Sequence, residues 1–99
     1  MRLKGKKCIV TGGSSGIGEA TVRRFISEGA EVLIADINLE DSKKLSEEIG
    51  EGVDYIKCDV RLEDDIISVS EKAYGMWDQV DVLVNNAGSE LNQSYDKMT

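Results

Sequence analysis

The residues of this chain that could do chemistry begin with a run rich in glycine and serine, from Thr11 to Gly18. This run follows the apolar stretch Cys8–Val10 and precedes a stretch with helical periodicity. Glycines let the backbone turn sharply and approach a ligand closely, and the first N–H groups of the following helix favour an anion. The pattern therefore predicts a phosphate cradle, with the pyrophosphate of a dinucleotide as the expected ligand.

The residues after this turn decide between two kinds of phosphate site. Gly13 and Gly18 have the spacing of P-loop glycines, but a P-loop continues with Lys and then Ser or Thr. Here Glu19 and Ala20 follow, and a carboxylate where a triphosphate needs an ammonium group argues against an NTPase. The spacing also departs from the common G-x-G-x-x-G pattern, and an ordinary Gly-Ser loop is the alternative for an isolated match.

A second candidate group is Asp36, which follows the strand-like run 31–35, about 20 residues after the glycine turn. An acid at this position can accept hydrogen bonds from both hydroxyls of an adenosine ribose. A 2′-phosphate would face the carboxylate, and Ser15, Ile37 and Asn38 supply no cation to bind it. Asp36 therefore predicts NAD rather than NADP, although a single Asp at a strand end is usually a turn or cap residue.

The glycine turn, Asp36 and two further motifs occur in the same order as in the short-chain dehydrogenase/reductase (SDR) family, which this chain resembles. Gly12, Gly16 and Gly18 fit its T-G-x-x-x-G-x-G pattern, residues 58–60 resemble its adenine-contact corner, and residues 85–88 match its N-N-A-G motif. The resemblance implies a Rossmann-type fold and hydride transfer between a nicotinamide cofactor and an alcohol or ketone.

The resemblance also implies roles for residues near the strand ends. Asp59 would accept from the adenine amino group, and Val60 would offer its backbone and an apolar surface. Asn86 would fix the central sheet and support the cofactor ribose, with Ala87 and Gly88 leaving room beside it. The expected cofactor-binding residues are Gly12, Ser14, Ser15, Gly16, Ile17, Gly18, Asp36, Ile37, Asp59, Val60, Asn86, Ala87 and Gly88.

The catalytic residues of the family have no counterpart in this pattern. Family members use a Tyr-x-x-x-Lys pair, whose Tyr exchanges a proton with the substrate hydroxyl, and a Ser some way upstream. Tyr95 is followed four positions later by Thr99, while Lys97 is only two positions away and would not share its helix face. Ser94 adjoins Tyr95. We therefore expect no catalytic residue in this chain.

Residues 1–99 are expected to form one partial Rossmann domain, with strands and helices over 1–88 and a variable loop over 89–99. The chain would then be the N-terminal, cofactor-binding part of an NAD-dependent oxidoreductase, cut within that loop. The alternative is a non-catalytic dinucleotide-binding or interaction module that ends at Thr99, or an inactive fragment.

Hydrophobic periodicity predicts the elements that position these groups. Continuous β-branched runs indicate strands buried on both faces, and stripes of helical period lie between them. Right-handed crossovers then give a doubly wound parallel α/β sheet with strand order 3-2-1-4. The strands are expected over residues 8–10, 31–35, 53–57 and 80–84. The helical stripes consist of Ile17, Thr21, Val22, Phe25 and Ile26; of Leu39, Ser42, Leu45 and Ile49; and of Ile66, Val69, Ala73 and Trp77, all interpreted as core together with Tyr74.

Composition excludes several partners. A formal net charge of −7 opposes binding to nucleic acid or anionic membranes, and no apolar run reaches the roughly 18 residues of a membrane span. A secretory signal fits poorly, so we expect a cytoplasmic protein with Cys8 and Cys58 reduced and in the core. No His is present, so no metal site is expected. The run Val80–Val84 would be an apolar sheet edge, which predicts self-association.

Overall fold

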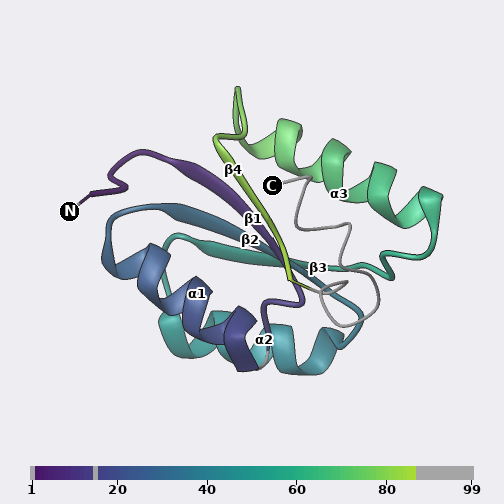
Figure 1. Cartoon of the computed structure of the whole chain (residues 1–99), viewed down its shortest axis with the longest axis horizontal. Coiled ribbons are helices and arrows are strands. Elements are labelled where there is room, and N and C mark those ends of the chain that lie inside the picture. The colour runs from purple at the N-terminus through teal and green to yellow at the C-terminus, as the bar shows by residue number, and fades with distance from the viewer. Residues whose placement is uncertain (1, 15, 87–99) are drawn as a thin grey trace.

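The computed structural model describes residues 2–14 and 16–86. Strands and helices alternate along these residues, and the strands form one parallel sheet in the order β3-β2-β1-β4 (Figure 1). The predicted fold class and strand order are therefore confirmed. The elements are β1 (Lys7–Thr11), α1 (Gly16–Ser27), β2 (Glu31–Asp36), α2 (Leu39–Ile49), β3 (Val53–Lys57), α3 (Glu63–Met76) and β4 (Val82–Asn85).

Helices cover both faces of the sheet, as the continuous apolar strands predict. On one face, α1 and α2 pack against Val10, Val32 and Ile34. On the opposite face, α3 packs against Leu33 and Ala35 (Figure 1). Successive residues of a strand point to opposite faces, so a strand covered on both sides buries every residue. This arrangement brings the carboxyl ends of β1, β2 and β4 to one edge, where the glycine turn lies.

The last strand begins later than expected. β4 covers Val82–Asn85 rather than Val80–Val84, and its register pairs Val82 with Cys8. Asp81 precedes it and contacts β1 twice: its amide donates to the Lys7 carbonyl at 2.8 Å, and its carboxylate accepts from the Lys7 amide at 2.9 Å. Because a side chain already satisfies that amide, regular pairing starts one residue further along.

Four residues interpreted as core are exposed, among them Leu39, which begins α2 and is 45% exposed. Ile17 is 77% exposed, because the buried side of α1 runs through Gly18 and Val22 instead. Ile66 and Tyr74 are 50% and 59% exposed, although Val69, Ala73 and Trp77 on or after the same helix are buried. Within residues 2–14 and 16–86, α3 has no neighbouring helix on its face of the sheet, so only its sheet-facing side is covered.

Candidate functional site

The glycine turn joins the end of β1 to the start of α1, as the sequence predicts. Gly12 and Gly16 have φ angles of +66° and +55°, in the region that residues with a Cβ rarely adopt. The Gly12 amide donates to the Ala35 carbonyl at 2.8 Å, so the turn starts in register with β2. The turn therefore needs glycine at two of its positions for backbone reasons alone.

Gly18 is required for a different reason, which is close approach. A Cβ at Gly18 would lie 1.9 Å from the carbonyl oxygen of Gly12 and 2.9 Å from Nδ2 of Asn86. The Asn86 amide itself donates to the Gly12 oxygen at 3.2 Å. The start of α1, the glycine turn and the end of β4 thus meet at one point, from three separate stretches of the chain.

Asp36, the last residue of β2, is tied to the same turn. Its carboxylate accepts hydrogen bonds from the Ser14 amide at 3.0 Å, from the Ser14 hydroxyl, and from the Asn38 amide at 2.9 Å. Asp36 is only 7% exposed. The acid predicted to bind a ribose therefore lies directly beside the turn predicted to bind phosphate.

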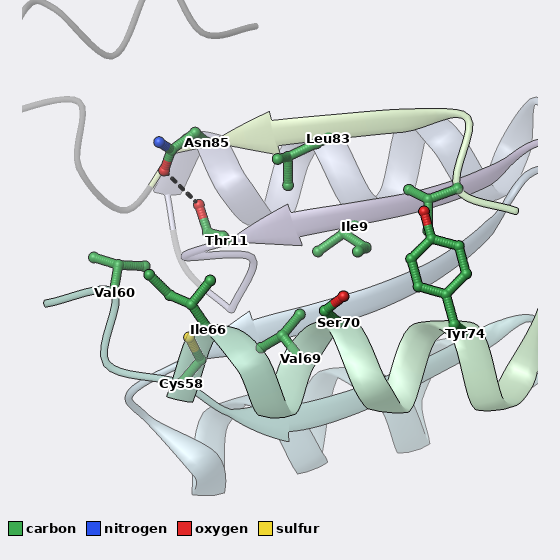
Figure 2. Close-up of a pocket in the computed structure, with 11 residues that line it drawn as sticks. Ile9, Thr11, Cys58, Val60, Ile66, Val69, Ser70, Tyr74, Leu83 and Asn85 are labelled. Atoms are coloured by element: carbon green, nitrogen blue, oxygen red, sulfur yellow. Dashed lines mark hydrogen bonds between the residues drawn. The ribbon is translucent and has the colours of Figure 1, made fainter. Parts of the chain in front are cut away.

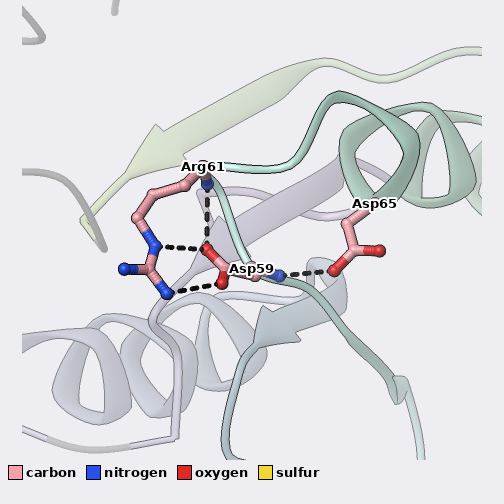
Figure 3. Close-up of polar contacts among 3 residues, drawn as sticks. All are labelled: Asp59, Arg61 and Asp65. Atoms are coloured by element: carbon pink, nitrogen blue, oxygen red, sulfur yellow. Dashed lines mark hydrogen bonds and ion pairs between the residues drawn. The ribbon is translucent and has the colours of Figure 1, made fainter.

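Asp59 lies just beyond β3, next to this arrangement. The Cys58 amide donates to the Asp36 carbonyl at 2.9 Å, which continues the pairing of β2 and β3. The Asp59 carboxylate accepts from the Arg61 side chain and amide, while its own amide donates to Asp65 of α3 (Figure 3). The hydrogen bonds from the Arg61 side chain, followed by that from its amide, lower the pKa of Asp59 to about 2.

The predicted site residues can now be placed. Close contacts join Gly12, Gly18 and Asn86 at the glycine turn. Hydrogen bonds join Ser14 of the same turn to Asp36, and Ile17 and Ile37 are exposed. Gly16 begins α1, and Asp59 and Val60 follow β3. The predictions for Ser15, Ala87 and Gly88 lie outside the described residues, as do Ser94, Tyr95 and Lys97.

Two contacts were not predicted from the sequence. The hydrogen bonds between Ser14 and Asp36 join residues 22 positions apart, and no spacing rule pairs them. The contact between Arg61 and Asp59 spans two positions, and the proximity of the two residues in the sequence could have suggested it.

An apolar groove of about 380 Å³ lies between α3 and the face of β1 and β4 on the same side of the sheet (Figure 2). The Thr11 hydroxyl donates to Oδ1 of Asn85 at 3.1 Å at the end nearest the glycine turn. The groove is lined by Ile9, Thr11, Cys58, Val60, Ile66, Val69, Ser70, Tyr74, Val80, Leu83 and Asn85. It accounts for the exposure of Ile66 and Tyr74 on α3, because both residues form part of its wall.

The two cysteines are buried, one on each side of the sheet. Burial is the main cause that raises the pKa of both Cys8 and Cys58, and nearby carboxylates raise it further. Both side chains are counted in the apolar core, where they pack as small residues. Across the described part of the chain, none of the helices is both long enough and apolar enough to span a membrane.

Comparison with known proteins identifies the family. Residues 6–99 match the short chain dehydrogenase family. The chain belongs to this family. Among its relatives, (21S)-21-acetoxyl-apo-melianone synthase from Melia azedarach is 41% identical over 87 residues, which cover 88% of this chain and 32% of that protein. 3beta-Hydroxysteroid dehydrogenase 2 from Eggerthella lenta is 40% identical over 89 residues, covering 87% and 34%.

A solved structure agrees with the fold of this SDR chain. The 3-ketoacyl-(acyl-carrier-protein) reductase from Brucella melitensis, crystallised with NADH, superposes with a TM-score of 0.79 at 33% identity. The superposition covers 82% of this chain and 33% of that one. The chain thus spans about a third of the length of these relatives and matches an N-terminal part of the family fold.

Proposed function

We propose that this chain is the cofactor-binding part of an NAD-dependent short-chain oxidoreductase. The observation that carries the proposal is the contact of Gly18, Gly12 and Asn86, which leaves no room for a side chain where α1 begins. Close backbone approach at the start of a helix exposes N–H groups to an anion, which is what a pyrophosphate requires. The membership of the chain in the SDR family, whose members use NAD or NADP, supports the same conclusion.

The residues present fit such a cofactor. The turn between Gly12 and Gly18 would bind the pyrophosphate through backbone amides, and Ile17, exposed at its mouth, would contact the cofactor from α1. Asn86, with Ala87 and Gly88 after it, would support the ribose on the nicotinamide side. When bound, the nicotinamide would supply hydride transfer to the carbonyl carbon of a ketone or from the corresponding carbon of an alcohol. The proposed substrate of the complete polypeptide is a small alcohol or ketone.

The preference for NAD over NADP follows from the surroundings of Asp36. Its carboxylate already accepts a hydrogen bond from the Ser14 hydroxyl, so a ribose hydroxyl can donate there when the serine rotates away. A 2′-phosphate would bring about two negative charges to the same buried carboxylate. The register pairs Asp36 with the exposed Lys57, a cation that could offset part of this repulsion.

The experiment is a titration of NADH and NADPH, followed by the fluorescence of the reduced nicotinamide, on the polypeptide as its native source makes it. We expect the unmodified protein to bind NADH more tightly than NADPH. The difference between the two affinities should narrow in Asp36→Ala and narrow or reverse in Asp36→Arg. Asp78→Ala is the matched control, because it removes the same charge from an exposed site just before β4. Lys57→Ala should widen the difference. Equal affinities in the unmodified protein would refute the NAD preference, and no binding of either cofactor would refute the proposed function.

The intact mass of the native polypeptide distinguishes the oxidoreductase from the non-catalytic alternative. If the native polypeptide has an intact mass near 10.8 kDa, it is a binding module, because this chain supplies only the proposed cofactor half. A mass more than twice as large would favour the oxidoreductase. Turnover of NAD with an alcohol, measured on that same native material, would contradict the module directly.

A further inference from the structure

Asp59 and Arg61 form a fork that leaves little freedom to the carboxylate. Oδ1 of Asp59 accepts from the Arg61 amide at 3.0 Å and from its Nε at 2.9 Å, and Oδ2 accepts from Nη2 at 2.7 Å (Figure 3). The Asp59 backbone is fixed as well, because its amide donates to Asp65 at 2.9 Å and its carbonyl accepts from the Leu62 amide at 2.9 Å.

The hydrogen-bond capacity of this carboxylate can be counted. An ionised carboxylate has about four acceptor positions, two on each oxygen. Because Arg61 lowers the pKa of Asp59 to about 2, the group is ionised at any ordinary assay pH and can only accept. Arg61 fills both positions on Oδ1 and one on Oδ2. Among the described residues, one acceptor position therefore stays open, and it belongs to Oδ2.

We infer that Arg61 is a positioning residue that turns this single acceptor of Asp59 toward the 6-amino group of the bound purine. The inference rests on the proposed function and on the adenine contact that the family resemblance implies for Asp59. An acceptor held in one orientation favours a purine that carries a donor at position 6. A purine with a 6-oxo group places an acceptor against an acceptor and is disfavoured. Arg61 then contributes to base selection without touching the base.

The Arg61 side chain is 72% exposed, so only the fork restricts it. This exposure gives the inference a clear competitor, in which the guanidinium occupies the space of the base and must leave before adenine binds. The two ideas predict opposite effects of removing the side chain. In the first, the affinity for the cofactor falls; in the competitor, it rises.

The test compares NADH with reduced nicotinamide hypoxanthine dinucleotide, whose base differs by the 6-oxo group. The measured quantity is the ratio of their dissociation constants in the native polypeptide. We expect Asp59→Asn to abolish a preference for NADH of roughly tenfold, the size of one hydrogen bond to a charged group. Arg61→Ala should reduce the ratio by about threefold or more, and Arg61→Lys, which keeps the charge but not the fork, should restore only part of it.

Arg24→Ala is the matched control. Arg24 has the same 72% side-chain exposure, lies in the last turn of α1 and pairs with Glu28. We expect no change in the ratio for this variant, and unchanged far-UV circular dichroism in all variants will show that the fold is retained. A ratio that changes in Asp59→Asn but not in Arg61→Ala would overturn the inference. Tighter NADH binding by Arg61→Ala would also overturn it, in favour of the competitor.

The result distinguishes this inference from the proposed function. NADH binding with a ratio that Asp59→Asn leaves unchanged would refute the adenine contact, and with it the inference, but would leave the proposed function standing. Absence of NADH binding by the unmodified native polypeptide would refute both.

Discussion

Replacing Gly18 with Ala sets local and tertiary effects against each other. Gly18 lies in α1, where helix propensity alone favours Ala over Gly by up to about 1 kcal/mol. The structure predicts the opposite sign. The added Cβ would lie 1.9 Å from the Gly12 carbonyl oxygen and 2.7 Å from its carbonyl carbon, whereas ordinary van der Waals contact begins at 3.4 Å.

The size of the effect follows from what can move. The nearest atoms are backbone, so no side-chain rotation relieves the overlap, and α1 must shift away from the glycine turn. Overpacking of this kind typically costs 1–3 kcal/mol, and a clash with backbone belongs near the upper end. Subtracting the gain in helix propensity leaves a net destabilisation of about 2 kcal/mol. For a chain of this length, that corresponds to a fall in Tm of about 8–16 °C.

The assay is urea and thermal unfolding followed by far-UV circular dichroism and by the fluorescence of Trp77. Trp77 is the one tryptophan of the chain, is buried, and donates from Nε1 to Glu31 at 3.2 Å at the opposite end of β2 from the site. Its fluorescence therefore reports unfolding rather than changes at the glycine turn.

Gly75→Ala is the matched control for this substitution. Gly75 lies in α3, and a Cβ there would meet no atom within 4 Å, so this variant should be as stable as the unmodified chain or up to about 1 kcal/mol more stable. We also expect Gly18→Ala to lose NADH binding and Gly75→Ala to retain it. A Gly18→Ala chain that is as stable as the Gly75→Ala chain would refute the close approach of α1 to the turn, and with it the argument for the cradle.

Three further predictions concern charge, reactivity and association. The Asp59 carboxyl should titrate near pH 2 in ¹³C NMR. Because its pKa is lowered, the carboxyl stays ionised as the pH falls from neutral and loses its charge only near that value. Arg61→Ala should return the pKa of Asp59 toward 3.8. Cys8 and Cys58 should react slowly with iodoacetamide at pH 8 in the folded protein and quickly in urea, since their raised pKa values keep both thiols protonated, and equal rates in both conditions would contradict their burial. Leu83, half exposed on β4, should support self-association of the 99-residue chain, so Leu83→Lys should shift it toward monomer in sedimentation velocity, whereas Leu62→Lys, at an equally exposed position outside the groove, should not.

Much of the fold could be predicted because it depends on local pattern and on handedness. The apolar runs at 8–10 and 31–35 are strands buried on both faces, and right-handed crossovers together with the Rossmann topology give the order β3-β2-β1-β4. The glycine turn was recognisable because its steric requirement is local: Gly12 and Gly16 adopt positive φ angles. The start of β4 was misplaced because Asp81 uses its side chain on Lys7, a contact across 74 residues.

The helical stripes show where periodicity stops being informative. It predicts which residues share a helix face, but the position of the sheet beneath decides how much of that face is buried. Tyr74 and Ile66 are exposed for this reason, although they continue an apolar surface with Val69. Ile17 is exposed because Gly18, and not Ile17, faces the turn.

The sequence by itself determined the order of the elements, their chirality and the residue types at the candidate site, because backbone sterics and apolar period act over short distances along the chain. Only the tertiary structure decided which of those residues meet. Asn86 contacts the Gly12 carbonyl across 74 positions, and Ser14 binds Asp36 across 22. Such contacts arise when parallel strands end at one edge, and they depend on distances in space that no spacing along the chain encodes.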